Sequence, residues 1–256
     1  MIAVATLFKN SAWIVKDFLA AVVSQTHGAK DTRLIFLDDA SSDTTVDLLR
    51  AFAKKQKGKY ASIEVLASVD AYANNSSSRD LPQRDTAGYA HLATLRNTVL
   101  ARAASSDADH ALLLDSDILL APGCIDALLA WQQPFVATLV NNDAHLTGRL
   151  SLDPNGWVGA SLNGRTPARG LPANTLCEVL VACGAMLIDR SVLDSGAMFA
   201  GHRDDEVGAF CYALRDRGIP RSVDTTRRAV HVMEPRFLDD AKLMLKALTP
   251  GVKGTE

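Results

Sequence analysis

Two carboxylates one residue apart follow an apolar run, and they are the side chains of this sequence best placed to do chemistry. Residues 110–122 read His-Ala-Leu-Leu-Leu-Asp-Ser-Asp-Ile-Leu-Leu-Ala-Pro, with Asp115 and Asp117 after the run. A buried parallel strand is a continuous apolar run, and residues i and i+2 of an extended chain point to the same side. Converging carboxylates repel each other, and a hard divalent cation or a set of hydrogen-bond donors offsets that repulsion. The segment favours a cation site, with an Asx turn capped by Asp117 as the structural alternative.

Acidic turns recur elsewhere in the chain. Asp38-Asp39 follows another apolar run, and Asp204-Asp205-Glu206 precedes a later helical pattern. Open α/β sheets bind ligands beyond the carboxyl ends of their strands, where such turns meet. Three acidic turns in a chain whose net charge is only -2 indicate a ligand site and not general acidity.

The composition is that of an ordinary globular protein. The chain has 256 residues, of which 48% are hydrophobic and 22% charged, enough for one large α/β domain. Its balanced charge gives no electrostatic reason to expect DNA, RNA or an anionic membrane as a partner. The cysteines lack C-x-x-C spacing, which argues against a zinc site or a redox motif and favours reduced, buried thiols. They are Cys124, Cys177, Cys183 and Cys211.

The first residues lead straight into a strand pattern without a basic leader, and no apolar segment is long enough to span a bilayer. We therefore expect a cytoplasmic protein. Peripheral contact with a membrane through a surface patch is compatible with this expectation.

Strand and helix patterns alternate through the first half of the chain. This alternation predicts an α/β fold in which helices cover both faces of a mostly parallel central sheet, in three layers. Strands are expected at 2–7, 33–37, 63–66 and in the run before Asp115, and helices at 12–25, after Ser42 or Asp43, and at 92–104.

The second half is less regular, and no repeat or linker divides the chain. Residues 68–88 hold few apolar side chains and are expected to form a long mobile loop. We expect a single domain over 1–256, with halves at about 1–120 and 121–235 and a C-terminal helix and tail at 236–256. The patterns predict strands at 135–140 and 176–188, a segment rich in Gly, Pro and Asn at 151–173, and a helix at 205–217.

Short segments along the chain resemble, in order, the motifs of family 2 glycosyltransferases with the GT-A fold. The resemblance covers roughly residues 1 to 232, and it rests on the order of the motifs more than on any one of them. The segments are Val4-Ala-Thr-Leu-Phe-Lys-Asn10, Leu37-Asp-Asp-Ala-Ser-Ser-Asp-Thr-Thr45, Leu95-Arg96-Asn97, Leu112-Leu-Leu-Asp-Ser-Asp-Ile118, Cys183-Gly184-Ala-Met186-Leu-Ile-Asp-Arg190, Asp205-Glu206 with Phe210-Cys211, and Val230-His231.

The resemblance implies transfer of a sugar from a UDP- or GDP-linked donor to a hydroxyl of a glycan or another acceptor. In that family pattern, Asp39 would hydrogen-bond the base and Asp38 would support that turn or the ribose. The backbone from Thr6 to Phe8 would cradle the nucleoside, and Arg96 would lie near the donor. The first 120 residues would then be the nucleotide-binding half, and the following residues the acceptor side.

The same resemblance implies a manganese or magnesium ion. Asp117 would ligate the ion, and His231 would complete the coordination. Asp115 would touch the ribose or the water shell of the ion, and Ser116 would line the donor site. Carboxylate, imidazole and water suit Mn²⁺, and a divalent ion neutralises the charge of the departing diphosphate.

On the acceptor side, the resemblance implies a carboxylate that takes the proton of the attacking hydroxyl in an inverting displacement. Asp205 and Glu206 are both candidates for this base, and both would also complement the dipole of a following helix. A retaining transferase and a catalytically idle domain that binds a nucleotide sugar or glycan are the alternatives. The sequence argues against a sugar-nucleotide-forming nucleotidyltransferase, because such enzymes open with a glycine-rich loop and residues 1–10 hold no glycine.

The chain departs from the family pattern at Ala40, which stands where the family has glycine. We therefore expect this position not to need a positive φ. His231 has the alternative role of a strand-end histidine, and the remaining candidates His91, His145 and His202 are interpreted as surface or core residues.

Overall fold

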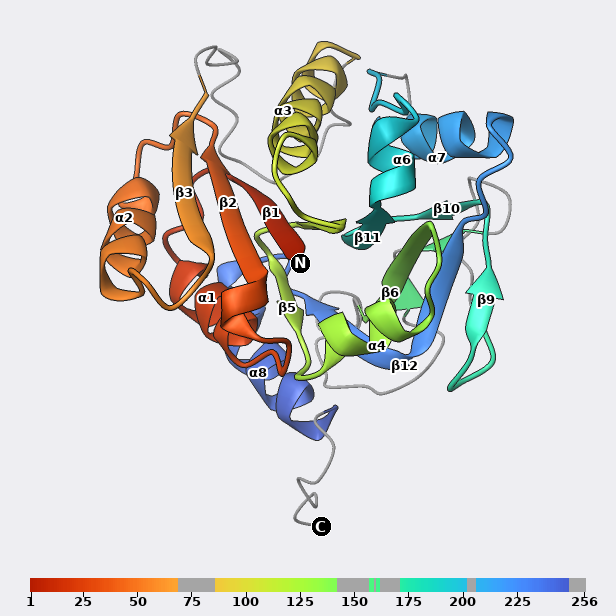
Figure 1. Ribbon diagram of the computed structural model, residues 1–256. Coiled ribbons are helices and arrows are strands. Elements are labelled where there is room, and N and C mark those ends of the chain that lie inside the picture. The colour runs from red at the N-terminus through yellow and green to blue at the C-terminus, as the bar shows by residue number, and fades with distance from the viewer. Residues whose placement is uncertain (69–85, 142–156, 159, 162–170, 202–205, 249–256) are drawn as a thin grey trace.

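The computed structural model describes residues 1–68, 86–141, 157–158, 160–161, 171–201 and 206–248 (Figure 1). The strands are β1 Ile2–Phe8, β2 Thr32–Asp38, β3 Ser62–Ala67, β4 His110–Leu114, β5 Ile118–Leu120, β6 Phe135–Asn141, β7 Trp157–Val158, β8 Ala160–Ser161, β9 Leu176–Glu178, β10 Val181–Ala182, β11 Ala185–Asp189 and β12 Ser222–His231. The α-helices are α1 Val15–Val23, α2 Thr45–Lys55, α3 Thr86–Ala104, α4 Cys124–Ala130, α6 Arg190–Asp194, α7 Glu206–Asp216 and α8 Leu238–Ala247.

A ten-stranded mixed sheet forms the centre of the fold. Its path is β3-β2-β1-β4-β11-β6-β12-β5, with β7 paired to β6 and β9 paired to β12. β1 is parallel to β2 and β4, whereas β11 is antiparallel to both of its neighbours, β4 and β6. β12 is parallel to β6. Strands β1, β2, β4, β6 and β12 therefore run in one direction, and their carboxyl ends lie at the same edge of the sheet.

Helices cover both faces of this sheet. Alternate residues of β1 belong to different core clusters: Ala3 and Ala5 pack with α3, α6 and α7, and Ile2 and Val4 pack with α1, α2, α4 and α8. Successive side chains of a strand point to opposite faces, so a strand buried on both sides is apolar throughout. Figure 1 shows α3, α6 and α7 grouped on one side of the sheet. The predicted three-layer, mostly parallel α/β fold is confirmed.

Two expected elements differ from the structure. The segment 176–188 is not one strand but three, because its pieces pair with different strands: β9 with β12, β10 with β8, and β11 with β4 and β6. Helix α3 begins at Thr86, so the loop expected to reach Gly88 ends earlier, and residues 69–85 lie outside the described residues. The predicted division near residue 120 stays a prediction, but β5 pairs with β12, so both halves share one sheet.

All four cysteines are free. Cys124 and Cys211 are buried as expected, but Cys177 and Cys183 are partly exposed, so the expectation of burial is wrong for these two. Cys124 is fully buried, and burial raises the pKa of its thiol to about 12. Within the described ranges no helix is both long and apolar enough to cross a membrane. The cytoplasmic location stays a prediction.

Candidate functional site

The carboxyl edge of the sheet gathers the predicted donor-side residues. Asp38 ends β2, Asp115 directly follows β4, and His231 ends β12. The register pairs His231 with Ile118, which brings the imidazole next to Asp117. His231 Nε2 lies 3.3 Å from Asp117 Oδ2, and the side chains are 25% and 19% exposed. The two predicted metal ligands are therefore neighbours at the mouth of this edge.

Arg96 lies at the centre of the site and contacts two acids. Its Nη1 donates to Asp115 Oδ1 and its Nε donates to Glu206 Oε1, both at 3.0 Å. Burial alone would lower the pKa of Arg96, but the charges of Asp115 and Glu206 outweigh it and raise that pKa, so the guanidinium stays protonated. The guanidinium of Arg96 thus joins Asp115, a predicted donor-side residue, to Glu206 at the start of α7.

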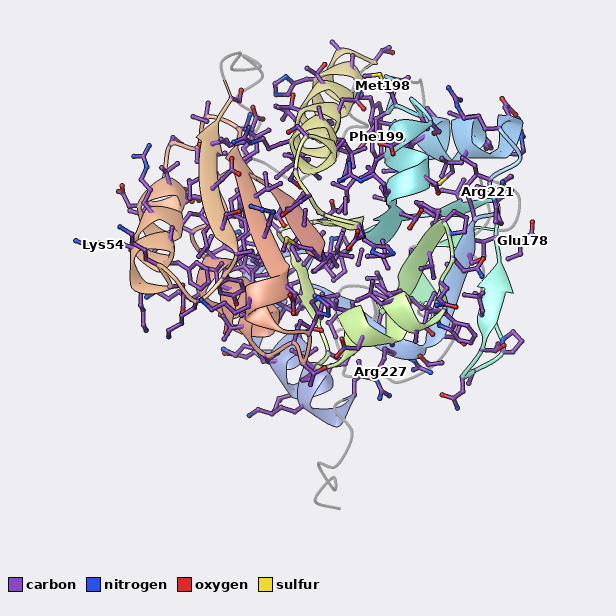
Figure 2. The ribbon with its side chains drawn as sticks, in the orientation of Figure 1. Lys54, Glu178, Met198, Phe199, Arg221 and Arg227 are labelled. Atoms are coloured by element: carbon purple, nitrogen blue, oxygen red, sulfur yellow. The ribbon has the colours of Figure 1, made fainter. Side chains whose placement is uncertain are left out.

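Phe199 packs against the same helix, α3, from the predicted acceptor side. Asn97 clamps its backbone: Asn97 Nδ2 donates to Phe199 O at 2.9 Å, and Phe199 N donates to Asn97 Oδ1 at 2.8 Å. The Phe199 ring stacks on Phe210 with centroids 4.2 Å apart, and Arg96 lies 5.6 Å from its centroid. Figure 2 labels Phe199 beside α3 and the exposed Met198 next to it. These contacts hold the chain at Phe199 against α3 and α7.

Asp39 is buried between two basic side chains that the sequence did not single out. Its Oδ2 accepts from Lys9 Nζ at 3.0 Å, and its Oδ1 lies 2.8 Å from His91 Nε2. Its backbone N–H donates to Phe8 O at 2.8 Å, which ties the turn to the end of β1. His91, interpreted from the sequence as a surface or core residue, is thus a partner of a predicted site residue. Its position depends on α3 beginning before the periodic pattern at residue 92, and no local signal marked this.

Asp38 and Thr6 carry buried polar atoms. Asp38 Oδ2 accepts from Ser41 N at 3.0 Å, whereas Asp38 Oδ1 and Thr6 Oγ1 find no hydrogen-bond partner in the described part of the chain. The turn places Ala40 at φ +49°, so the expectation that this position avoids positive φ is wrong. The hydrogen bond from Ser41 N–H to Asp38 Oδ2 holds the turn together. Ala40 is exposed, so its left-handed conformation costs only the local backbone strain of about 1–2 kcal/mol.

The Phe8 ring belongs to the core. It lies edge-on to Phe18 and Phe36, with centroids 5.3 and 5.5 Å away. The Phe8 side chain therefore belongs to the core, and the backbone cradle from Thr6 to Phe8 stays a prediction. Ser116 lies between the two aspartates with its Oγ 3.4 Å from Ser11 Oγ.

Gly184 supports the acidic turn after β4. Its carbonyl accepts from Asp115 N at 2.9 Å, and its φ is +89°. A Cβ at this position would lie 2.5 Å from Ile118 Cδ1. The turn therefore needs glycine both for the backbone angle and for space.

The side chains of Asp117 and His231 fit a divalent cation whose remaining ligands are water and phosphate. Among the residues that the structure describes, no three or more His, Cys, Asp or Glu side chains cluster as metal ligands. Asp117 and His231 supply one carboxylate and one imidazole, while Asp115 has one oxygen on Arg96. Such a pair leaves coordination positions for water and phosphate, as Mn²⁺ and Mg²⁺ require. Asp204, Asp205, His145 and His202 lie outside the described residues.

A family model described as glycosyltransferase family 25, N-terminal domain, matches residues 1–161. The chain belongs to this family. The match contains Asp39, Arg96, Asp115 and Asp117, but ends before Glu206 and His231. The predicted resemblance to glycosyltransferases with the GT-A fold is confirmed, with family 25 as the matching model in place of family 2.

Two curated relatives are both described as glycosyltransferase 25 family members. The protein of Aedes aegypti is 26% identical over 162 residues, which cover 62% of this chain and 25% of the relative. The protein of Drosophila pseudoobscura pseudoobscura is 29% identical over 163 residues, which cover 62% and 24%. The match thus spans about a quarter of the length of these relatives.

Solved glycosyltransferase structures share the fold of this chain. GalNAc-T7, solved with UDP, GalNAc and Mn²⁺, superposes with a TM-score of 0.65 at 14% identity, over 90% of this chain and 43% of that chain. The mannosyltransferase PcManGT of Pyrobaculum calidifontis, solved with GDP-Man and Mn²⁺, gives 0.60 at 13% identity, over 96% and 63%. S. aureus TarS with UDP gives 0.57 at 14% identity, over 96% and 64%.

Proposed function

We propose that this family 25 chain transfers a sugar from a nucleotide-diphosphate sugar to an acceptor hydroxyl, with Mn²⁺ or Mg²⁺ as cofactor. The observation that supports this function best is the meeting of the Asp117–His231 pair with the Arg96–Asp115 pair at one edge of the sheet. That edge is where open α/β sheets bind ligands. The UDP, GDP-Man and Mn²⁺ of the structures with the same fold are compatible with the proposal.

The donor nucleoside is proposed to bind along the ends of β1 and β2. Asp39 would accept a hydrogen bond from an N–H of the base, because an ionised carboxylate only accepts. Thr6 Oγ1 and Asp38 Oδ1, buried and without partners among the described residues, would gain partners from the ribose or from ordered water. The backbone around Phe8 would line the nucleoside.

Asp117 and His231 would hold the cation, and Ser116 would line the donor beside them. When bound, the ion would act as a Lewis acid that neutralises the charge of the departing diphosphate. Asp115, with its Oδ1 on Arg96, would contact the ribose or the water shell of the ion. Arg96 holds Asp115 in place, and Asp117 would bind the cation.

The acceptor hydroxyl is proposed to attack the anomeric carbon with inversion. A bond then forms between its oxygen and that carbon as the carbon–phosphate oxygen bond breaks, and a carboxylate takes the hydroxyl proton. Glu206 is 2% exposed, and its Oε1 is bound to Arg96. This burial supports a positioning role for Glu206 and favours Asp205, its neighbour outside the described residues, as the base.

The test is release of nucleoside diphosphate by the purified chain with UDP- and GDP-linked sugars and a panel of glycan acceptors. We expect Mn²⁺-dependent release that EDTA abolishes, and loss of it in Asp117→Asn. His231→Ala should raise the metal concentration needed. Asp126→Asn is the matched control, because Asp126 also lies 3.3 Å from a histidine, His27, but on the α4 side of the protein.

Two results would contradict the proposal. EDTA-treated protein that binds the donor as tightly as metal-loaded protein would exclude the cation. Metal-dependent donor binding without release, under all acceptor conditions, would identify a catalytically idle nucleotide-sugar-binding domain.

A further inference from the structure

The surface formed by α1, α2 and the turns beside them carries a local excess of positive charge. Together α1, the short turn Ala29–Asp31, α2 and the loop at 56–61 hold seven basic and three acidic residues. Lys30 Nζ donates to the carbonyl of Gly58, which joins the turn to the loop. The net charge of -2 over the whole chain conceals this basic surface, whose members are Lys16, Lys30, Arg50, Lys54, Lys55, Lys57 and Lys59.

The charge of the basic surface is not neutralised by neighbouring acids. Residues 48–63 hold five of the seven basic residues and no acid. Of the acids on the same elements, Asp17 pairs with Lys242 of α8 at 3.7 Å. Asp31 and Asp47 form no ion pair with any residue in the described ranges, and the same is true of the seven basic side chains. The exposed ammonium groups are therefore available to an anionic partner.

An apolar groove of about 390 Å³ lies between α1 and α2, within the basic surface. Lys16 and Lys55 also line the groove, and Val23 is 48% exposed. Lysine places its methylene stem along apolar surface and keeps its ammonium in water. Figure 2 shows Lys54 on α2 pointing away from the body of the protein. The apolar side chains that line the groove are Val15, Leu19, Val23, Leu48 and Phe52.

The composition of this surface favours a lipid partner over a protein partner. Six of the seven basic residues are lysines, and protein–protein interfaces are depleted in lysine and enriched in arginine and aromatic residues. A lysine ammonium is a point charge on a flexible stem, which suits mobile headgroups, whereas the arginine fork suits a fixed carboxylate. Four to eight basic residues beside an apolar face are typical of surfaces that bind anionic lipid.

We propose that the basic surface docks this chain on a membrane with anionic headgroups. The ammonium groups would contact lipid phosphates, and Val23 and the groove would meet the apolar part of the interface. The lysines at 54–59 lie between the end of α2 and the start of β3, at the edge of the sheet opposite to the carboxyl edge. Docking there leaves the candidate site accessible. The inference does not depend on the proposed function.

The experiment is co-sedimentation of the whole chain with two kinds of vesicle, one of phosphatidylcholine with phosphatidylglycerol and one of phosphatidylcholine alone. We expect binding to the anionic vesicles only, and weaker binding at high salt, which screens the lysines. Lys54→Gln combined with Lys55→Gln should weaken this binding about 25-fold, because each lysine near an anionic surface contributes about fivefold. Val23→Asp should also weaken it, since the new charge would face the lipid.

Matched controls lie elsewhere on the protein. Arg215→Gln combined with Arg217→Gln removes two exposed positive charges at the end of α7. Met198→Asp changes another exposed apolar residue, which Figure 2 labels well apart from Lys54. Both controls should bind anionic vesicles like wild type, and circular dichroism checks that every variant is folded.

Three results would overturn the inference. The first is equal binding of wild type to both kinds of vesicle. The second is unchanged binding in the double lysine variant or in Val23→Asp, which would place the lipid contact elsewhere. The third is no binding to anionic vesicles at low salt, which would leave an acidic protein segment as the occupant of the groove. None of these measurements uses a nucleotide, so they leave the proposed function untouched.

Discussion

Arg96 Nε and Glu206 Oε1 meet at 3.0 Å although the two residues are 110 positions apart in the chain. Their side chains are 9% and 3% exposed, so the contact is shielded from solvent. It joins α3, which carries partners of Asp39 and Asp115, to the first residue of α7. The two sides of the candidate site are thus connected by one buried ion pair.

Removal of the positive charge of Arg96 should strongly destabilise the fold. Arg96→Met leaves Glu206 buried without its partner, and we expect the free energy of unfolding to fall by about 3–5 kcal/mol. Arg102→Met is the control on the same helix, because Arg102 contacts Glu64 at 2.7 Å but is 52% exposed. Its loss should stay below about 1 kcal/mol. Urea titration measures the free energy of unfolding of both variants. Equal losses would show that the buried ion pair stabilises the fold no more than the exposed one.

The kcat of amide variants should distinguish the two candidate bases, Asp205 and Glu206. We expect Asp205→Asn to lower kcat by about 10²–10⁴ with donor affinity nearly intact. Glu206→Gln keeps an acceptor for Arg96 but loses a charge, so its loss of kcat should be smaller and accompanied by lower stability. The opposite order would assign the base to Glu206. Near-normal kcat in both variants, or a product with the donor's anomeric configuration, would replace inversion by a retaining mechanism.

Gly184→Ala should damage both stability and donor binding. The new Cβ would overlap the Ile118 side chain and displace the carbonyl that accepts from Asp115 N. Gly196→Ala is the control: its φ is +73°, and a Cβ there would meet nothing within 4 Å. It should therefore cost only the strain of a left-handed residue, about 1–2 kcal/mol. A loss of UDP affinity in the control as large as in Gly184→Ala would contradict a local role for Gly184.

Ala40→Gly should stabilise the protein by about 1 kcal/mol, because glycine adopts φ +49° without strain. Ala51→Gly, at an exposed position inside α2, should act in the opposite direction by a similar amount. Thermal unfolding of both variants measures the difference. A destabilised Ala40→Gly would show that the turn relaxes to negative φ in solution.

The sequence predicted the strands that build the carboxyl edge to within about one residue at most ends. β1, β2 and β4 are covered by helices on both faces, so their side chains are continuously apolar and easily recognised. In segment 176–188, β10 and β11 are largely apolar and buried as well, whereas β9 ends in the exposed Glu178. Their division depends on which neighbour each piece meets, and a local pattern does not contain that information.

The acids of the site were also predictable, but of their partners only His231 beside Asp117 was, and that pair came from the family resemblance. Carboxylates at strand ends are placed by the strand itself, as Asp38 and Asp115 show. A long basic side chain such as Lys9 or Arg96 can reach several acids, and only the packing of distant elements decides which one it meets. The same holds for His91, whose place depends on the early start of α3.

The position of β12 also has a consequence for synthesis of the chain. β12 lies between β6 and β5 in the sheet, and Cys124 Sγ meets the carbonyl of Arg228 across 104 positions. A growing chain completes β5 and β6 long before β12 exists, so both strands must wait with open edges, which are prone to aggregation. His231 reaches Asp117 only when this last strand is inserted. Cation binding at that pair would therefore report that the sheet has closed.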